Sequence, residues 1–293
     1  MSDAPSLRTP VEITVNPYRI EGPALISFSG GRTSGYMLRK VLDAYDGQLP
    51  ADVKVTFANT GKEREETLRF VHECGSRWGV HIHWLEWRDR RTAPEVPFEE
   101  TGFNSASRSG EPFAALIAKK GYLPNAVTRF CTLELKVRVM RDFAKSIGWR
   151  NWVNVVGLRY DEGHRVLKAI DRNAAGKDPW RTVMPLSKAR VTVRDVGAFW
   201  AAQPFDLGLK PYEGNCDLCF LKARAKLTAI MREQPGCSDW WSAQERSRTA
   251  TFVTEYRYAD LAREVAAQPH MFDELDDDEH DAECGLWCGG EAA

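Results

Sequence analysis

The fold is decided by one stretch of the chain, Leu25-Ile26-Ser27-Phe28-Ser29-Gly30-Gly31-Arg32-Thr33-Ser34. It begins as a short apolar run and then breaks at two glycines. Because apolar residues after the break recur at the spacing of a helix face, the stretch predicts a strand, a glycine turn and a helix, in that order. The residues that set this helical spacing are Met37, Leu38, Val41, Leu42 and Tyr45.

The same alternation of strand and helix continues to about residue 200. Residues 63–78 carry acidic side chains in their first turn and are followed by Gly79, which is typical of a helix with a defined start and end. Alternating elements of this kind predict an α/β fold with a mostly parallel sheet and helices on both of its faces. We expect further strands at 53–58, 80–85 and 152–156, and a helix marked by Leu133, Val137, Met140, Phe143 and Ile147 that stops at Gly148.

Three regions are expected along the chain. Residues 1–200 form the α/β domain, residues 201–272 form a mainly helical, cysteine-bearing region packed on the sheet, and residues 273–293 form an acidic, cysteine-bearing tail. The polar connection at 88–110 is long for its kind, so we expect it to be either disordered or a lid over a site.

Composition places the 293-residue chain among ordinary soluble globular enzymes, with 43% hydrophobic and 28% charged residues. It excludes disordered, collagen-like and membrane classes. No apolar run approaches the length of a membrane span, and residues 1–19 lack the layout of a signal peptide, so we expect a cytoplasmic protein without a membrane partner. The chain has seven cysteines. An odd number of cysteines, in a protein expected in a reducing compartment, argues against a disulfide framework and favours chemical roles.

The net charge of −1 conceals an asymmetry between the tail and the rest of the chain. Residues 273–293 hold nine of the 41 acidic residues and none of the 40 basic ones, which leaves 32 acids against 40 bases, or about +8, elsewhere. A basic body favours anionic partners such as nucleotides or nucleic acid. The tail is either a solvated acidic arm with a binding role or a run of charge that only keeps the end soluble.

The glycine turn lies where backbone N–H groups and a helix N-terminus converge outside the carboxyl end of a strand, which is typical of an anion site. Gly30 and Gly31 permit close approach of the backbone, and the serine and threonine hydroxyls add donors for phosphate oxygens. The alternative is a turn that only caps a helix. Position 27 is not the glycine of G-x-S-x-G, and neither the Walker pattern nor G-x-G-x-x-G is present.

Ser29-Gly30-Gly31-Arg32-Thr33-Ser34 resembles the S-G-G-x-[DT]-S pyrophosphate loop of the PP-loop ATP pyrophosphatases, which have the Rossmann-like adenine nucleotide alpha-hydrolase-like fold. Later segments are similar, in the same order, to landmarks of the phosphoadenosine phosphosulfate (PAPS) reductase family. They are Asn59-Thr60-Gly61-Lys62-Glu63 with Thr67, Gly157-Leu158-Arg159-Tyr160-Asp161-Glu162 with Arg165, Pro185-Leu186, Val193-Arg194-Asp195-Val196, and Asn215-Cys216-Asp217-Leu218-Cys219.

The resemblance implies an adenine nucleotide across the carboxyl ends of the strands: ATP with Mg²⁺ in a pyrophosphatase, or PAPS or adenylyl sulfate in a reductase. Arg159 would contact phosphate or sulfate, for which its planar fork is suited, and Asn59 would meet the base or ribose. The alternative is that Arg159 and Arg165 are surface salt-bridge residues. The expected nucleotide-binding residues are Ser27, Ser29, Gly30, Gly31, Arg32, Thr33, Ser34, Asn59, Gly157 and Arg159.

Three cysteines stand amid positive charge. Cys216 and Cys219 form a C-x-x-C pair in a turn before a basic helix, and two thiolates at that spacing can bind one metal or cluster. Cys131 stands just before a helix expected to begin at Thr132, where the helix dipole and nearby basic residues favour a thiolate. The nearby basic residues are Arg129, Lys136, Lys222, Arg224 and Lys226.

Glu283-Cys284-Gly285-Leu286 resembles the E-C-G-L-H tail of the reductases, whose mobile cysteine attacks the sulfur of the nucleotide. The resemblance implies Cys284 as a catalytic thiol and a thiol reductant as its partner. We assign Cys131, Cys216 and Cys219 to a 4Fe-4S cluster, with Cys288 as the fourth ligand. An open fourth iron site and a structural zinc in the same cysteines are the alternatives.

Other candidate residues favour structural roles. Cys74 and Cys237 have no partner spacing and are expected to be ordinary buried or partly buried thiols. His81 and His83 alternate on one face of the third strand, which allows either strand packing or a two-histidine metal site. Trp240 and Trp241 are expected to be core or interface aromatics.

Three functions follow from these patterns. The first is an ATP pyrophosphatase that adenylates an acceptor for cluster-assisted sulfur insertion, and the complete Ser-Gly-Gly loop favours it. The second is a sulfonucleotide reductase acting through Cys284, which the tail favours. The third is a zinc-stapled protein that only binds nucleotide or nucleic acid. Basic helices near Cys131 and Cys219 allow tRNA or DNA as the acceptor.

Overall fold

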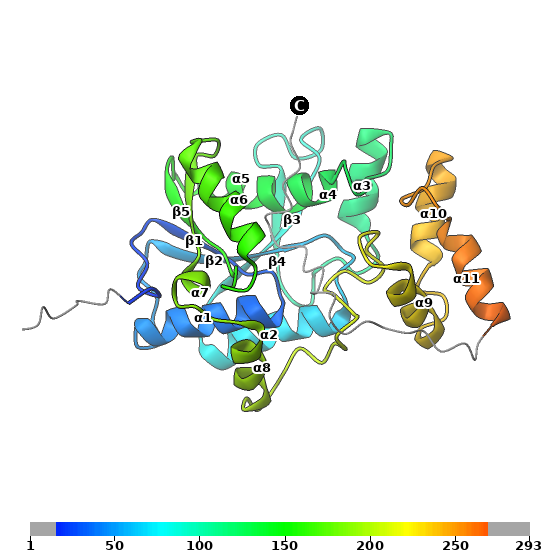
Figure 1. Cartoon of the computed structure of the whole chain (residues 1–293). Helices are drawn as coiled ribbons and strands as arrows, with labels where there is room; N and C mark the ends of the chain where they lie inside the picture. The colour runs from blue at the N-terminus through cyan, green and yellow to red at the C-terminus, as the bar shows by residue number, and fades with distance from the viewer. Residues whose placement is uncertain (1–15, 269–293) are drawn as a thin grey trace, which may run out of the picture.

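The computed structural model describes residues 16–268, and its centre is a six-stranded sheet with the strand order β4-β3-β2-β1-β5-β6 (Figure 1). Neighbouring strands are parallel except β4, which runs antiparallel to β3 at the edge. The expected α/β fold with a mostly parallel sheet is therefore confirmed. The strands are β1 (Ala24–Ser27), β2 (Val53–Asn59), β3 (Ile82–Trp87), β4 (Phe98–Thr101), β5 (Trp152–Val155) and β6 (Trp180–Val183).

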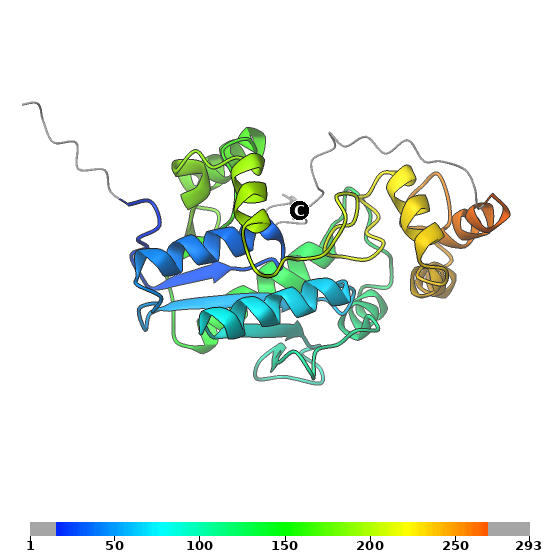
Figure 2. The same cartoon turned by 90° about the horizontal axis from the view of Figure 1, so that it is seen from below.

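Helices cover both faces of the sheet, as expected (Figure 1). One face carries α1, α2, α7 and α8, and the other carries α3 to α6, while α9, α10 and α11 lie beyond one end of the sheet in both views (Figure 2). The helices are α1 (Arg32–Ala44), α2 (Glu65–Trp78), α3 (Glu111–Lys120), α4 (Phe130–Thr132), the π-helical η1 (Leu133–Arg138), α5 (Val139–Ser146), α6 (Gly163–Ala174), α7 (Pro185–Lys188), α8 (Val193–Ala201), α9 (Arg224–Glu233), α10 (Asp239–Arg248) and α11 (Tyr258–Ala267).

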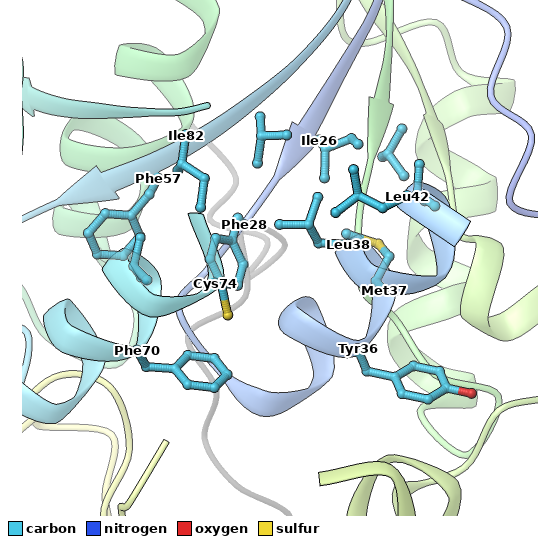
Figure 3. Close-up of a cluster of buried hydrophobic side chains, with 14 of the residues drawn as sticks. Ile26, Phe28, Tyr36, Met37, Leu38, Leu42, Phe57, Phe70, Cys74 and Ile82 are labelled. Carbon is cyan, nitrogen blue, oxygen red and sulfur yellow. The ribbon is translucent and has the colours of Figure 1, made fainter. Parts of the chain in front are cut away.

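Successive residues of β1 face opposite sides of the sheet and contribute to two apolar cores. Ile26 packs with Phe57 and Cys74 in the core beneath α1 and α2 (Figure 3). Burial raises the pKa of the Cys74 thiol well above its ordinary value, so this cysteine is the inert buried thiol that its spacing predicted. Leu25 belongs to the second core, which also contains Trp241 and apolar residues of α5, α9 and α11. The helices after residue 200 therefore pack on the same core as the sheet, and the three-region division of the chain stays a prediction.

The structure corrects several expected elements. The stretch 88–110 is neither disordered nor only a lid, because it contains the edge strand β4. The helix expected to begin at Thr132 begins at Phe130 and widens into the π-helical η1 before α5. Of the basic residues expected near the C-x-x-C pair, Arg224 and Lys226 lie on α9, whereas Lys222 precedes it. Within residues 16–268, the helices are all too short or too polar to cross a membrane.

Candidate functional site

The strand order of the sheet reverses between β1 and β5, since the chain runs outward through β2 and β3 and later resumes at β5 on the other side. In such sheets ligands bind outside the carboxyl ends of the strands at this reversal. Ser27 donates from Oγ to Oδ1 of Asn154 on β5 at 2.7 Å, which ties the two strands together. A Cβ on Gly157 would lie 3.4 Å from Cα of Ser34, so the chain leaving β5 passes close to the start of α1. Two expected binding segments therefore meet at the reversal.

The glycine turn between β1 and α1 has the conformation of a backbone cradle. Gly30 has a φ of +80°, and a Cβ there would lie 2.7 Å from Cγ2 of Thr67, so the position requires glycine. Gly31 is the extended residue at the N-cap of α1, where no side chain caps the helix. Ser29 donates from Oγ to Oγ of Ser34 at 3.0 Å, and Ser34 donates to the carbonyl of Gly31 at 2.9 Å. Because the first N–H groups of a helix lack intrahelical acceptors, this turn is suited to an anion.

Arg159 is buried and reaches the glycine turn from the segment after β5. Its Nη1 donates to Oγ1 of Thr33 at 3.0 Å, and its Nε donates to Oδ1 of Asp161 at 2.9 Å. Burial alone would raise the pKa of Asp161, but hydrogen bonds and the Arg159 charge outweigh it and lower that pKa. Arg165 instead forms an ion pair with Glu162. Arg159 is thus a buried part of the turn, whereas Arg165 has the expected alternative role in a salt bridge.

The Arg32 side chain, expected to contact the nucleotide, is engaged in an ion pair with Asp206. Its Nε donates to Oδ1 of Asp206 at 2.8 Å, and its Nη2 donates to the carbonyl of Leu209 at 3.2 Å. Nε1 of Trp200 donates to the Arg32 carbonyl at 2.8 Å. The Arg32 guanidinium therefore holds Asp206 and Leu209 against α1, and the Arg32 carbonyl holds Trp200.

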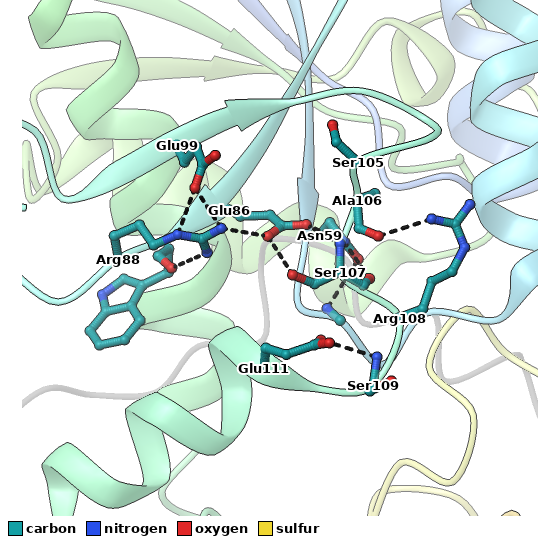
Figure 4. Close-up of polar contacts among 12 residues, drawn as sticks. Asn59, Glu86, Arg88, Glu99, Ser105, Ala106, Ser107, Arg108, Ser109 and Glu111 are labelled. Carbon is teal, nitrogen blue, oxygen red and sulfur yellow. Dashed lines mark hydrogen bonds and ion pairs between the residues drawn. The ribbon is translucent and has the colours of Figure 1, made fainter.

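Asn59 ends β2 as expected, but its amide is engaged within a buried network (Figure 4). Nδ2 donates to Oε1 of Glu86 at 2.7 Å and to the carbonyl of Ser107 at 2.9 Å, and Oδ1 accepts from the N–H of Gly61 at 3.0 Å. Since these contacts use both amide hydrogens, contact with a base or ribose through Nδ2 would require one of them to be exchanged.

Glu86 organises this network, although no sequence pattern indicated a role for it. It is fully buried, and it also accepts from the N–H and Oγ of Ser107, at 2.6 and 2.7 Å, and from Arg88 at 3.0 Å (Figure 4). Farther along the same loop, Arg108 donates to the carbonyl of Ala106 at 2.9 Å. The loop 102–110 is therefore held by polar contacts at the carboxyl ends of β2 and β3.

The segment that carries Cys216 is bonded to both loops of the site. Nδ2 of Asn215 donates to the carbonyl of Ser29 in the glycine turn at 2.9 Å, and the N–H of Arg64 donates to the carbonyl of Asn215 at 2.7 Å. The N–H of Asp217 donates to the carbonyl of Lys62 at 3.0 Å, and their side chains form a largely buried ion pair at 2.7 Å. The cysteine segment and the glycine turn are therefore parts of one hydrogen-bonded unit.

Cys216 is half-buried, and charged side chains surround it. Its Sγ is 3.9 Å from Oε1 of Glu63, and Nζ of Lys136 is 3.3 Å from the same oxygen. Nζ of Lys222 donates to the main-chain carbonyl of Cys216. Lys136 and Lys222 are both buried, so two positive charges lie close to Cys216.

Cys131 packs against the second apolar core. Cys131 lies in α4, directly before the π-helical turn that carries Lys136, so the helix of Cys131 and the Cys216 segment meet at Glu63. Such turns are frequent at functional sites, and the sequence pattern gave no sign of this one. Cys219 is buried near Tyr258, whose pKa is raised well above its ordinary value by burial and then by this cysteine.

Two expected residues fall outside the described part of the chain. Cys284, the expected catalytic thiol, and Cys288, the expected fourth ligand, lie beyond residue 268, as does the acidic tail. Cys237, by contrast, is partly buried, and burial followed by the charge of Asp217 raises its thiol pKa to about 11. Cys237 therefore stays protonated at neutral pH, as expected for an ordinary thiol.

Comparison with known proteins gives relatives whose names state no activity. No protein-family model matches the chain. The chain is 29% identical over 220 residues to the uncharacterized nin region protein ORF290 of Escherichia phage lambda, which covers 72% of this chain and 70% of that protein. It is 30% identical over 141 residues to an uncharacterized 37.8 kDa protein of Escherichia phage 186, covering 40% and 41%. It is 27% identical over 169 residues to uncharacterized protein MJ0066 of Methanocaldococcus jannaschii, covering 57% and 29%.

One solved structure aligns with most of this chain, but the structural similarity is weak. The U34-tRNA thiolase NcsA from Methanococcus maripaludis, solved with its 4Fe-4S cluster, aligns with 91% of this chain and 80% of that chain, at 12% identity and a TM-score of 0.32. A TM-score this low does not establish a common fold.

Proposed function

We propose that the protein binds ATP in the glycine turn, cleaves it to AMP and pyrophosphate, and so activates an acceptor for sulfur transfer assisted by a 4Fe-4S cluster. The observation that carries this proposal is the hydrogen bond from Asn215 to the carbonyl of Ser29. It joins the proposed pyrophosphate turn directly to the residue before Cys216, so nucleotide chemistry and thiol chemistry would share one site.

The nucleotide half of the proposal is supported by the position of the turn and the charge around it. The turn lies at the reversal of strand order, and it leads into a helix N-terminus that no side chain caps, where N–H groups can donate to phosphate oxygens. Arg159 adds a buried guanidinium that already contacts Thr33 in the turn. Mg²⁺ would offset the charge on the β and γ oxygens.

The thiol half is supported by the donors and cations around Cys216. Cys131, Cys216 and Cys219 would hold the cluster, because thiolates are the ligands that iron-sulfur clusters prefer. Lys136 and Lys222 are buried near Cys216, and their charge suits the negative charge that thiolate ligands bring. When bound, the cluster would supply an iron site that holds sulfur. Cys284 and Cys288 remain candidates for the catalytic thiol and the fourth ligand.

The proposed reaction has two displacements. An oxygen of the acceptor attacks the α-phosphorus of ATP, the bond from that phosphorus to the α–β bridging oxygen breaks, and pyrophosphate leaves. Sulfur from a sulfide donor then displaces AMP from the acceptor. The chain's part in the first step is to hold the phosphates through the turn and Arg159, so that the leaving group is stabilised.

A nucleic-acid acceptor is favoured by a cationic groove beside the helix of Cys131. The groove, of about 400 Å³, lies among α3, η1, α5 and the connection before β4. Its lining carries five basic side chains against two carboxylates, an excess that suits phosphodiesters. The basic side chains are Arg90, Lys119, Lys120, Arg138 and Arg141, and the carboxylates are Glu134 and Asp142.

Calorimetric titration of the purified protein with ATP and Mg²⁺ tests the nucleotide site. Arg159→Met should weaken ATP binding about 10- to 100-fold, the usual cost of a charge-assisted hydrogen bond. Arg172→Met is the matched control, because Arg172 forms a two-bond ion pair with Asp178 outside this site. Equal ATP affinity in both folded variants would contradict the proposed site.

A further inference from the structure

We propose that His81, His83 and Glu100 form a binding site for a divalent transition-metal ion, with Zn²⁺ as its best fit. The alternation of the two histidines allowed either strand packing or a two-histidine site, and the structure adds a carboxylate to them. This proposal is independent of the nucleotide site. His83 lies near the start of β3, whereas Glu86, near the end of the same strand, contacts Asn59.

The three ligand atoms are already gathered. Nδ1 of His83 is 2.6 Å from Oε1 of Glu100, and Nε2 of His81 is 3.5 Å from the same oxygen. All three ligand atoms lie within 4.8 Å of one another. A tetrahedral zinc ion with bonds of about 2.0–2.1 Å holds its ligands roughly 3.3 Å apart. Small side-chain rotations would therefore convert the present hydrogen-bonded group into a coordination site.

The sheet explains why these side chains share one face. His81 and His83 are two residues apart, and Glu100 of β4 is paired directly with Leu85 of β3. Residues two apart along a strand, and residues directly opposite across a pair, project to the same side. The ring of Phe143 lies 4.6 Å from that of His83 and limits its movement.

Exposure and charge allow an ion to enter. The side chain of His83 is 17% exposed, while His81 and Glu100 are 74% and 43% exposed, so solvent reaches one side of the group and can supply a fourth ligand. Lys54 on β2 contributes positive charge near His83, which the carboxylate of Glu100 offsets. Two imidazoles and one carboxylate favour Zn²⁺ over Mg²⁺ or Ca²⁺, which prefer oxygen ligands.

The consequence would be a cross-link between β3 and the edge strand β4. In the described part of the chain, β4 pairs with β3 alone, and its residues are exposed or half-buried. A metal bridge at Glu100 would therefore slow local opening of this edge.

Cobalt distinguishes this site from the cysteines, because thiolate ligands add intense charge-transfer absorption that nitrogen and oxygen ligands do not. Metal-free, tag-free protein should bind one equivalent of Co²⁺ without thiolate bands, and Zn²⁺ should displace it. Glu100→Gln and His81→Ala should weaken this binding at least tenfold, and both alter exposed side chains, so the fold should be kept. His164→Ala, on an exposed position of α6, should leave it unchanged.

Hydrogen exchange gives a second readout. Zn²⁺ should slow amide hydrogen exchange in β4 of the wild-type protein. It should not change the exchange rate in β4 of Glu100→Gln. The proposal is overturned if Glu100→Gln and His81→Ala bind Co²⁺ like the wild type, or if all bound cobalt carries thiolate bands. If the metal-site proposal fails, the ATP-binding proposal is unaffected. If the nucleotide-site proposal fails, metal binding by His81, His83 and Glu100 should still be observed.

Discussion

Asn215 donates a hydrogen bond from Nδ2 to the main-chain carbonyl of Ser29 at 2.9 Å, across 186 positions of sequence. The carbonyl of Asn215 in turn accepts from the N–H of Arg64. Asn215 therefore bridges the glycine turn and the segment after β2, while its neighbour Cys216 lies against Glu63. This hydrogen bond gives the glycine turn a direct contact with the cysteine segment.

Asn215→Ala should remove the hydrogen bond that joins the glycine turn to the cysteine segment. The loss of one partly buried hydrogen bond should cost about 1 kcal/mol in the free energy of unfolding. ATP binding should weaken as well, because the Ser29 carbonyl loses its donor. Asn173→Ala is the control, since Asn173 also bonds to backbone, at Thr182 on β6, but lies away from the turn. Calorimetry and thermal unfolding measure both effects. Equal losses of ATP affinity in Asn215→Ala and Asn173→Ala would show that the hydrogen bond from Asn215 to Ser29 does not contribute to ATP binding.

The two glycines of the turn should respond differently to substitution. Gly31 is extended, with a φ of −98°, so Gly31→Val should fold and lose ATP binding by local steric exclusion. Gly30 has a positive φ and no room for a Cβ, so Gly30→Ala should lower the free energy of unfolding by about 1–3 kcal/mol. Gly47 has a similar φ, and a Cβ there would meet no neighbouring atom. Gly47→Ala therefore measures the cost of the backbone conformation alone. Unchanged ATP affinity in folded Gly31→Val would make the pyrophosphate-turn assignment wrong.

Protein purified without oxygen should be brown and contain iron. Cys131→Ser, Cys216→Ser and Cys219→Ser should each lose the iron-linked absorbance, because each removes a proposed ligand. Cys74→Ala should keep it, since Cys74 is fully buried in the opposite core. Iron and zinc assays with visible spectra provide the measurement. Stoichiometric zinc without iron in the wild type would favour the structural-zinc alternative.

The Arg32–Asp206 ion pair should make stability depend on pH. The hydrogen bond from Arg32, against the opposing effect of burial, lowers the pKa of Asp206 below its ordinary value of 3.8. A carboxyl with a lowered folded-state pKa stabilises the fold above its unfolded pKa and loses this contribution as the pH falls through the folded value. Asp206→Asn should therefore be less stable at neutral pH by up to about 1 kcal/mol, since the pair is partly exposed. The difference from wild type should shrink below about pH 4 in denaturant titrations. A constant difference down to pH 2 would contradict this role.

The sequence predicted the strands whose side chains are buried and missed those that are not. Apolar runs identified β1, β2, β3 and β5, although the boundaries of β3 shifted by two residues at each end. The edge strand β4 has two glutamates in the middle and an exposed surface, so no apolar pattern marks it. β6, another edge strand, has an arginine among its four residues.

The position of a site residue could be predicted where a turn of the backbone determines it. It could not be predicted where contacts between side chains determine it. The glycine turn and the Arg159 segment lie at the reversal of strand order, as the motifs indicated. Nothing in the sequence indicated that Arg32 would turn to Asp206 or that Glu86 would occupy the Asn59 amide. These partners lie far along the chain, and only the packed structure selects them.

The most direct test of the proposed function is the product formed from the nucleotide. With ATP, Mg²⁺, a sulfide donor and tRNA or DNA as acceptor, the anaerobic protein should release pyrophosphate and AMP in equal amounts. Cys284→Ser should retain this release, and Gly31→Val should abolish it. The contradicting result is the absence of pyrophosphate together with stoichiometric sulfite from PAPS or adenylyl sulfate that disappears in Cys284→Ser, because a hydroxyl cannot replace the thiolate as nucleophile.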